Sequence, residues 1–171
     1  MMYEANGITG AEMNGQGVIR VRDYNPDDID TLMRLFQAAV AAIPQTDYTS
    51  DQLRAWASQR LDRDAWLIRR ASKPTFVAQI DDEIAGFSDL TDAGYIDMMF
   101  VHPQYQGKGV ARALFARIMD VAQRKAIRML ETDASITARP FFKSCGFETL
   151  SSQEVAIGGQ VLRNYRMRLS L

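Results

Sequence analysis

The sequence has 171 residues, of which 47% are hydrophobic and 24% charged, and its formal net charge is −1. This length suits one domain that buries its own core without a metal or a disulfide. Acidic and basic residues are interleaved, which excludes a broad basic surface for nucleic acid, and no apolar run approaches the ~18 residues of a membrane span. We therefore expect neither nucleic acid nor a membrane as a partner.

The chain predicts a flexible extension over residues 1–17, which contain four glycines and no apolar period, and a single folded domain over residues 18–171. The first predicted elements are a strand (Val18–Tyr24), a helix (Asn25–Ile43) that Pro44 ends, a short helix beginning at Thr49 or Ser50, and a helix over Asp64–Arg70.

The spacing of apolar residues then changes to two, which is typical of strands. It predicts an antiparallel meander over Thr75–Ile80, Ile84–Leu90 and Tyr95–Val101. The remaining predicted elements are a helix (Gly109–Lys125), a strand (Arg128–Ser135), a short helix (Thr137–Cys145) that Gly146 ends, and a closing hairpin around Gly158-Gly159.

One cysteine, Cys145, and one histidine, His102, are present. A lone cysteine forms no internal disulfide, which is typical of the reducing cytoplasm. The same scarcity excludes a multi-histidine or cysteine-rich zinc site, and no acidic cluster has metal-ligand spacing, so we expect no metal. We interpret Cys145 as a small buried hydrophobe and not as an acyl-enzyme nucleophile.

A glycine-rich segment, Gln106–Ala111, joins the third meander strand to the long helix with the pattern Gln-x-x-Gly-x-Ala. It has neither the ending of a Walker A loop nor the third glycine of a Rossmann fingerprint. Small residues at the start of a helix let several backbone N–H groups converge on an anion. The pattern therefore indicates a diphosphate site, and the alternative is a plain loop-to-helix junction.

Several motifs in this order closely resemble the GCN5-related N-acetyltransferase (GNAT) superfamily, and its YafP-like bacterial branch in particular. They are the Val-His-Pro at 101–103, the Gln-x-x-Gly-x-Ala segment, and Ala-x-x-Phe-Phe-x-x-x-Gly-Phe at 138–147; Tyr48–Ala57 and Asp133–Phe147 carry the closer likeness. The resemblance implies an α/β (α+β) fold with a mixed, mostly antiparallel sheet of about seven strands flanked by helices. It also implies acetyl-CoA as cosubstrate.

The resemblance assigns roles to individual residues. It implies that the pyrophosphate is held by Gln106, Gly107, Lys108, Gly109, Val110 and Ala111. It implies that pantetheine pairs with Met99, Phe100 and Val101, with Ser135, Ala138 and Phe142 on the other side of the coenzyme. A bulge amide, assigned to Phe100, would polarise the thioester carbonyl.

An amine acceptor with a pKa of about 10.4 must lose a proton before it attacks, which costs about 4.6 kcal/mol at pH 7. Asp97 matches the strand position where many family members carry a glutamate base, so we expect it to be catalytic; the alternative is a solvated strand aspartate. Phe142 departs from the family, which usually has a tyrosine acid there. Solvent, Tyr105 or Tyr165 would then protonate the leaving thiolate.

The resemblance places the acceptor between the first helices and the closing hairpin, where Tyr48, Gln52 and Trp56 are candidate contacts. We expect a primary amine on a small molecule, while Trp56 alternatively anchors the core. The main rival function is a non-catalytic acyl-CoA-binding sensor or regulatory module; a nucleotide-phosphate binder is a third. Many relatives are dimers, so a homodimer stays open.

Overall fold

The computed structural model describes residues 17–58 and 62–171, so the predicted extension lies outside the described residues except for Gly17. The elements are β1 (Ile19–Asp23), η1 (Pro26–Asp28), α1 (Ile29–Ala41), α2 (Ser50–Ser58), α3 (Arg63–Ala71), β2 (Thr75–Ile80), β3 (Glu83–Asp89), β4 (Tyr95–Ile96), β5 (Met99–Val101), η2 (Pro103–Tyr105), α4 (Val110–Arg124), β6 (Met129–Ser135), α5 (Arg139–Ser144), β7 (Glu148–Ile157) and β8 (Gln160–Ser170). No helix in these two ranges has the length and apolar character needed to cross a membrane.

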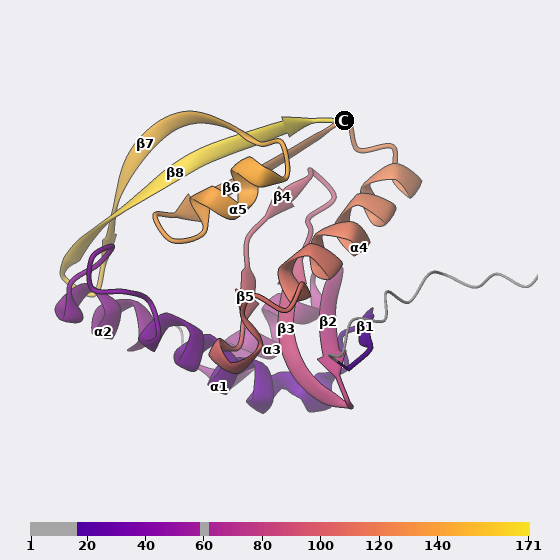
Figure 1. The fold of residues 1–171 in the computed structure, drawn as a ribbon, viewed down its shortest axis with the longest axis horizontal. Coiled ribbons are helices and arrows are strands. Elements are labelled where there is room, and N and C mark those ends of the chain that lie inside the picture. The colour runs from indigo at the N-terminus through magenta and orange to yellow at the C-terminus, as the bar shows by residue number, and fades with distance from the viewer. Residues whose placement is uncertain (1–16, 59–61) are drawn as a thin grey trace, which may run out of the picture.

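The strands form two four-stranded sheets, and the α+β class expected from the sequence is confirmed. The first sheet has the order β1-β2-β3-β5 and the second has the order β4-β6-β8-β7 (Figure 1). The predicted single strand Tyr95–Val101 is therefore two strands. β5 pairs antiparallel with β3, as the meander prediction requires, but β4 pairs parallel with β6 in the other sheet.

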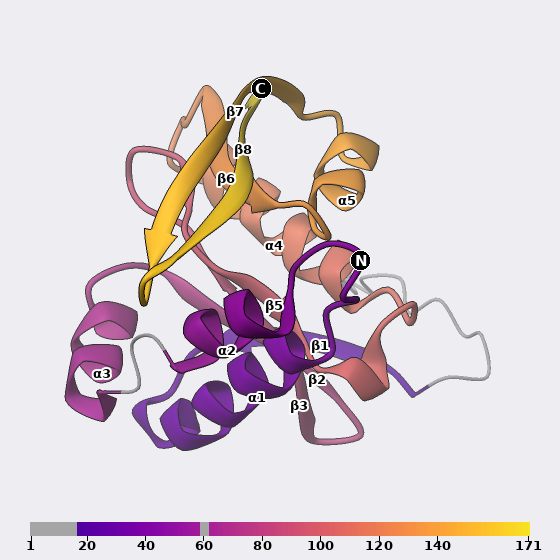
Figure 2. The ribbon, with the colours of Figure 1, turned by 90° about the vertical axis from the view of Figure 1, so that its left-hand side faces the viewer.

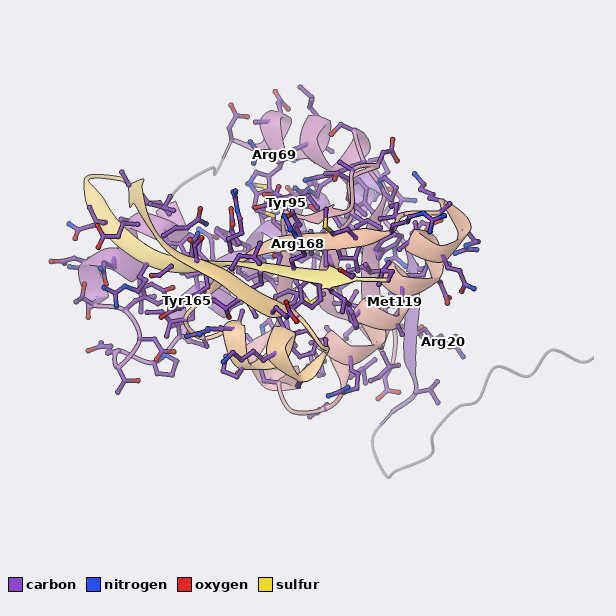
Figure 3. The ribbon with its side chains drawn as sticks, turned by 90° about the horizontal axis from the view of Figure 1, so that it is seen from above. Arg20, Arg69, Tyr95, Met119, Tyr165 and Arg168 are labelled. Carbon is purple, nitrogen blue, oxygen red and sulfur yellow. The ribbon has the colours of Figure 1, made fainter. Side chains whose placement is uncertain are left out.

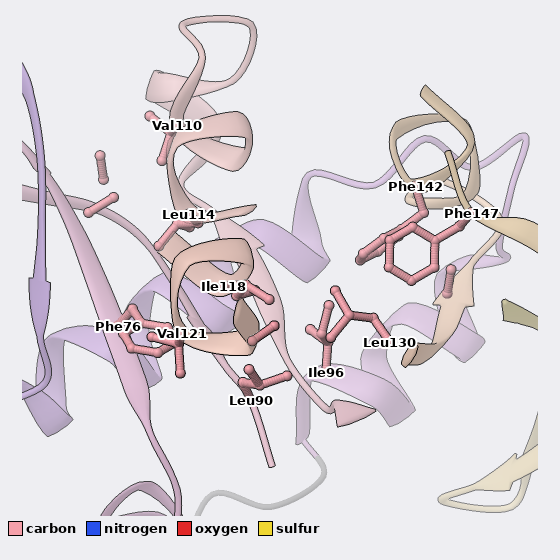
Figure 4. Packing of buried hydrophobic residues seen from close by; sticks show 14 of the residues in the cluster. Phe76, Leu90, Ile96, Val110, Leu114, Ile118, Val121, Leu130, Phe142 and Phe147 are labelled. Carbon is pink, nitrogen blue, oxygen red and sulfur yellow. The ribbon is translucent and has the colours of Figure 1, made fainter. Parts of the chain in front are cut away.

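Helices cover both faces of the first sheet, because alternate residues of a strand point to opposite sides. Phe76 and Ala78 of β2 belong to the apolar cluster that includes α4, whereas Val77 between them belongs to the cluster that includes α1. Leu114 and Ile118 lie on the buried face of α4 (Figure 4). Each such side chain stabilises the fold by roughly 1.5–3 kcal/mol.

The closing hairpin is formed by β7 and β8, and the sequence prediction of its turn is confirmed. Gly158 and Gly159 have φ angles of 54° and 79°, the left-handed region that a tight two-residue hairpin turn requires. The turn end of the hairpin lies beside α2 (Figures 1 and 2). Figure 3 looks down on the hairpin, with Tyr165 and Arg168 of β8 labelled.

Candidate active site

The chain crosses from one sheet to the other at Asp97-Met98, between β4 and β5. Oδ1 of Asp89, at the end of β3, accepts the N–H groups of Asp97 (2.9 Å) and Met98 (3.1 Å). The carbonyl of Met98 in turn accepts from the Ser88 hydroxyl at 2.7 Å. The Asp89 side chain thus provides the acceptor that a neighbouring strand would provide for these N–H groups in a continuous sheet. β4 and β5 can therefore diverge at this point.

The divergence leaves one edge of β5 open among the described strands, because β5 ends the order of the first sheet. The N–H of His102 donates into β3 at 2.8 Å. Hydrogen-bonded residue pairs recur at every second position of an antiparallel ladder. The backbone N–H of Phe100, two residues before His102, is therefore directed toward its register partner Phe87 in β3. The amides of Met99 and Val101 face the open edge. The amide assigned to Phe100 from the sequence is therefore directed into the sheet and away from that edge.

A cavity of about 260 Å³ lies beside the point where the strands diverge. Its walls come from both sheets, from α1, α2 and α5, and from the hairpin. The residues predicted from the sequence that line it are Tyr48, Trp56, Asp97, Met99, Phe100, Ser135, Ala138 and Phe142. One cavity is thus lined by residues predicted to bind the coenzyme, to catalyse the reaction and to bind the acceptor. Tyr48 and Phe142, the two that lie furthest apart in the sequence, are 94 positions apart.

Gln52, the third predicted acceptor contact, does not line this cavity. Its Oε1 accepts the Thr49 N–H at 2.8 Å, while its Nε2 donates to the carbonyl of Val161 at 2.7 Å. Both ends of the amide are therefore engaged in starting α2 and in holding that helix against β8. This geometry corrects the expectation that Gln52 contacts the acceptor.

Tyr48 does line the cavity, but its hydroxyl joins three segments of the fold. The hydroxyl donates to the carbonyl of Arg163 at 2.6 Å and accepts the N–H of Ile136 at 2.9 Å. Only 3% of the residue is exposed, and this burial raises the pKa of the phenol. Tyr48 therefore positions the cavity wall and keeps its proton.

Asp97 lies at one end of the cavity, with its carboxylate among cations from the α3 region. Its Oδ2 is 2.8 Å from Nζ of Lys73, 3.7 Å from Nη2 of Arg70 and 4.0 Å from Nη1 of Arg69. About a quarter of the side chain, 26%, stays exposed. The site thus contains a carboxylate where the sequence predicted one, and its ion-pair partners Lys73, Arg70 and Arg69 were not identified from the sequence.

A second carboxylate, Asp133, faces the same cavity and was missed in the sequence. Ile96 and Thr132 are register partners in the parallel β4–β6 pair, so Asp97 and Asp133 directly follow the last paired residues. Asp133 accepts the Tyr95 hydroxyl at 3.0 Å. Burial first, and then the Asp133 charge, raise the pKa of Tyr95, which therefore remains a donor. The only signal in the sequence was the alternation within the predicted strand.

The glycine-rich segment lines a second cavity, of about 340 Å³, at the start of α4. Gly107 and Gly109 have φ angles of 73° and 87°, and Gly109 caps the helix with no side-chain bond. The first N–H groups of a helix have no acceptor within it. The predicted residues lining this cavity are Gln106, Gly107, Gly109, Val110 and Ala111, together with Val101 of β5. Lys108 instead lies 5.3 Å above the Tyr105 ring.

Tyr105 and Tyr165, the two tyrosines considered as acids for the leaving thiolate, lie outside the central cavity. The Tyr105 hydroxyl donates to Glu83 at 2.5 Å, and the Tyr165 ring packs against the guanidinium of Arg139 at 4.0 Å. Neither tyrosine lines the central cavity. Phe142, which does, carries no hydroxyl. In residues 17–58 and 62–171, no group of three His, Cys, Asp or Glu side chains is placed to bind a metal ion.

Comparison with known proteins identifies the family. A family model for the acetyltransferase (GNAT) domain matches residues 44–169. The chain is 37% identical over 150 residues to the uncharacterized N-acetyltransferase YafP of Escherichia coli K12, an alignment that covers 88% of this chain and 95% of that protein. The chain therefore belongs to the GNAT family of N-acetyltransferases, as the sequence motifs predicted.

Solved structures agree with this assignment. A GCN5-related N-acetyltransferase from Rhodopseudomonas palustris superposes with a TM-score of 0.87 at 30% identity, over 95% of this chain and all of that one. The PaiA N-acetyltransferase of Thermoplasma acidophilum, solved with coenzyme A, gives a TM-score of 0.73 at 15% identity, over 90% of this chain and 99% of that one. The second likeness concerns the fold alone.

Proposed function

We propose that this acetyltransferase moves the acetyl group of acetyl-CoA directly to a primary amine of a small molecule. One observation carries the proposal: the open edge of β5 connects two cavities. Val101 lines the cavity at the start of α4, and Met99 lines the central cavity. A coenzyme held at its diphosphate by the loop would then reach the central cavity with its thioester end.

The residues of the loop suit a diphosphate. Gly107 and Gly109 have backbone angles that other residues adopt only with strain, and a Cβ at Gly107 would meet no atom within 4 Å, so the space beside it is open. Uncapped N–H groups of Gly109, Val110 and Ala111 would donate to phosphate oxygens. Bonds of this kind, between N–H groups and charged oxygens, contribute roughly 1.5–3 kcal/mol each.

The rest of the coenzyme would follow β5. The outward amides of Met99 and Val101 suit the amide groups of pantetheine, and Ala138 and Phe142 would line the opposite side. Ser135 accepts the Ala138 N–H at 3.0 Å, so its hydroxyl orients the turn before α5 and keeps a proton to donate. We assign polarisation of the thioester carbonyl to the Met99 amide, because this amide points to the open edge of β5 and Met99 lines the central cavity.

The proton of the amine would leave through the carboxylates at the end of the cavity. The nitrogen attacks the carbonyl carbon and the carbon–sulfur bond breaks, while the released proton passes to Asp97, directly or through water, and then to solvent. Asp133 and Tyr95 would orient the nitrogen. The thiolate, with an ordinary pKa of about 8.5, leaves without the tyrosine acid that Phe142 replaces.

Direct transfer is favoured over an acyl-enzyme because, within residues 17–58 and 62–171, no cysteine lines the central cavity. Cys145 does not line the central cavity, and burial raises the pKa of its thiol. A thiol that stays protonated is a poor nucleophile. The family assignment likewise favours an enzyme over the non-catalytic acyl-CoA-binding module.

The test measures thiol release from acetyl-CoA across a panel of primary amines, with coenzyme binding measured separately by isothermal titration. We expect binding without an amine and turnover only with one. Asp97→Asn should lower kcat by at least tenfold and leave the coenzyme Kd unchanged. Tight binding with no turnover for any amine would instead identify a sensor, and no binding would remove the proposal altogether.

A further inference from the structure

The central cavity has an aromatic wall and is lined by the carboxylates of Asp97 and Asp133, and together these features describe a particular kind of acceptor. We infer that the acceptor is a primary amine joined by a short chain to a flat apolar ring, with no carboxylate beside the nitrogen. This inference rests on the proposed function and names its substrate class. It assigns the ring to the wall formed by Phe36, Tyr48, Trp56 and Phe100, and the nitrogen to Asp133.

The wall presents aromatic faces and edges at fixed angles. Trp56 lies between Tyr48 and Phe100, with ring centroids 5.7 and 6.3 Å away, and Phe36 meets Phe100 edge-on at 5.0 Å. Phe36 and Tyr48 are almost fully buried, whereas Trp56 is half-buried. Trp56 therefore has ring surface left to cover, and a second aromatic ring stacks or packs edge-on against it more favourably than a polar chain does.

The surroundings of Asp133 favour a positive charge at the nitrogen. Lys73 offsets the charge of Asp97 at 2.8 Å, whereas the donors closest to Asp133 are neutral: Gln153 Nε2 at 2.8 Å and the Tyr95 hydroxyl at 3.0 Å. Among the ion pairs of the described residues, Asp133 pairs with Arg166, which is more distant at 3.4 Å. An ammonium beside Asp133 would complete its coordination and make a charge-assisted hydrogen bond.

Charge and size exclude other amines. A carboxylate next to the nitrogen would lie beside Asp133, whose nearest donors are neutral, and would be repelled there, whereas Lys73 already offsets the charge of Asp97. Arg163 also lines the cavity, but its residue is exposed and stands opposite Glu154 in the hairpin ladder. The cavity of about 260 Å³ is small for a ligand site, since such sites span roughly 300–1,000 Å³, and it must also admit the thioester beside Met99.

The experiment compares matched acceptors with the full chain and acetyl-CoA. 2-Phenylethylamine and tryptamine are assayed against phenylalanine and tryptophan, which differ by the carboxylate alone, and against spermidine and kanamycin. We expect kcat/KM for the two arylalkylamines to exceed that for every other compound by at least tenfold. Coenzyme binding is measured in parallel by isothermal titration.

Three variants test the assignment of residues. Asp133→Asn and Trp56→Leu should each raise KM for 2-phenylethylamine by at least tenfold and leave the coenzyme Kd unchanged. Glu131→Gln is the matched control, because Glu131 lies two residues earlier on β6, pairs with Arg168 at 2.7 Å and does not line the cavity. Its kinetic constants should equal those of the parent chain.

The outcomes separate the two proposals. A preference for the amino acids, the polyamine or the aminoglycoside would overturn the inference and leave the acetyltransferase function standing. Equal KM values for Asp133→Asn and Glu131→Gln would also overturn it. Coenzyme binding with no turnover for any amine would instead remove the proposed function, and the inference with it.

Discussion

Arg70 and Asp89 form an ion pair of 2.5 Å in which neither side chain is exposed to solvent. Arg70 comes from α3, and Asp89 is the residue whose other oxygen accepts the amides of Asp97 and Met98. Lys73, 3.1 Å from the same carboxylate, extends the network to Asp97. A helix remote from the coenzyme loop therefore supports the point where the two sheets part.

We predict that Arg70→Met strongly destabilises the protein, because the Asp89 carboxylate would lose its buried partner. Loss of one partner of a buried ion pair costs about 3–5 kcal/mol. Urea denaturation should show this as a lower transition midpoint with a similar slope. Arg63→Met is the control, since Arg63 pairs with Asp30 at the surface and both side chains are about half exposed. Equal midpoints for the two variants would contradict the role assigned to Arg70.

We predict that Gly109→Ala weakens coenzyme binding by at least tenfold. The φ angle of 87° would be strained by about 1–2 kcal/mol for alanine, and relaxation would move the N–H groups of the loop. Gly146→Ala is a matched control, because Gly146 has a φ of 94° at the end of α5, outside both cavities. The Gly146→Ala variant should lose a similar amount of stability, and its Kd for the coenzyme should be unchanged in isothermal titration. An equal loss of coenzyme affinity in both variants would contradict the proposed diphosphate site in the loop before α4.

We predict that Tyr48→Phe lowers stability and raises the acceptor KM together. The change leaves the Arg163 carbonyl and the Ile136 N–H without their shared hydroxyl, at a cost of about 1–3 kcal/mol. Gln52→Ala should lower stability by about 1 kcal/mol, through loss of the helix cap, but leave KM unchanged. Denaturation curves and steady-state kinetics on both variants provide the check. A raised KM for Gln52→Ala would place that residue back in the site.

We predict that part of the stability is lost above pH 10 through Tyr95. Its pKa is raised in the folded state by burial and by Asp133, so the unfolded chain releases the phenolic proton first, near pH 10. The contribution is complete below that pH and falls as pH rises toward the folded-state value. Urea unfolding between pH 8 and 11 should show a steeper decline for the parent chain than for Tyr95→Phe. Parallel declines would refute the assignment.

The sequence was informative wherever structure depends on near neighbours. The helix starts, the turn at Gly158-Gly159 and the loop before α4 follow from local residue preferences, and the structure confirms these elements. The break at Asp97-Met98 was not predictable, because its cause is a carboxylate contributed by β3. The alternation of apolar and polar residues predicts Tyr95–Val101 as a single strand. No local pattern indicates that the Asp97 N–H bonds to the side chain of Asp89, eight residues earlier.

The partners of individual site residues were likewise beyond the reach of the sequence. Spacing identified Asp97 as a candidate base, but not Lys73 beside it, which lies in the bend between α3 and β2. Asp133 alternates along β6 like any polar strand residue, so only the packing of β4 against β6 reveals that it shares a cavity with Asp97. Gln52 was misjudged because helix capping and ligand contact require the same kind of side chain.

The dual service of Asp89 has a practical consequence for engineering. One carboxylate neutralises a buried guanidinium and also holds the backbone where the chain crosses between the sheets, so a substitution there would alter stability and the shape of the site together. Mutant libraries aimed at new acceptors should hold Asp89 constant and diversify the α2 and hairpin walls instead. Those walls shape the cavity but belong to neither strand of the crossing.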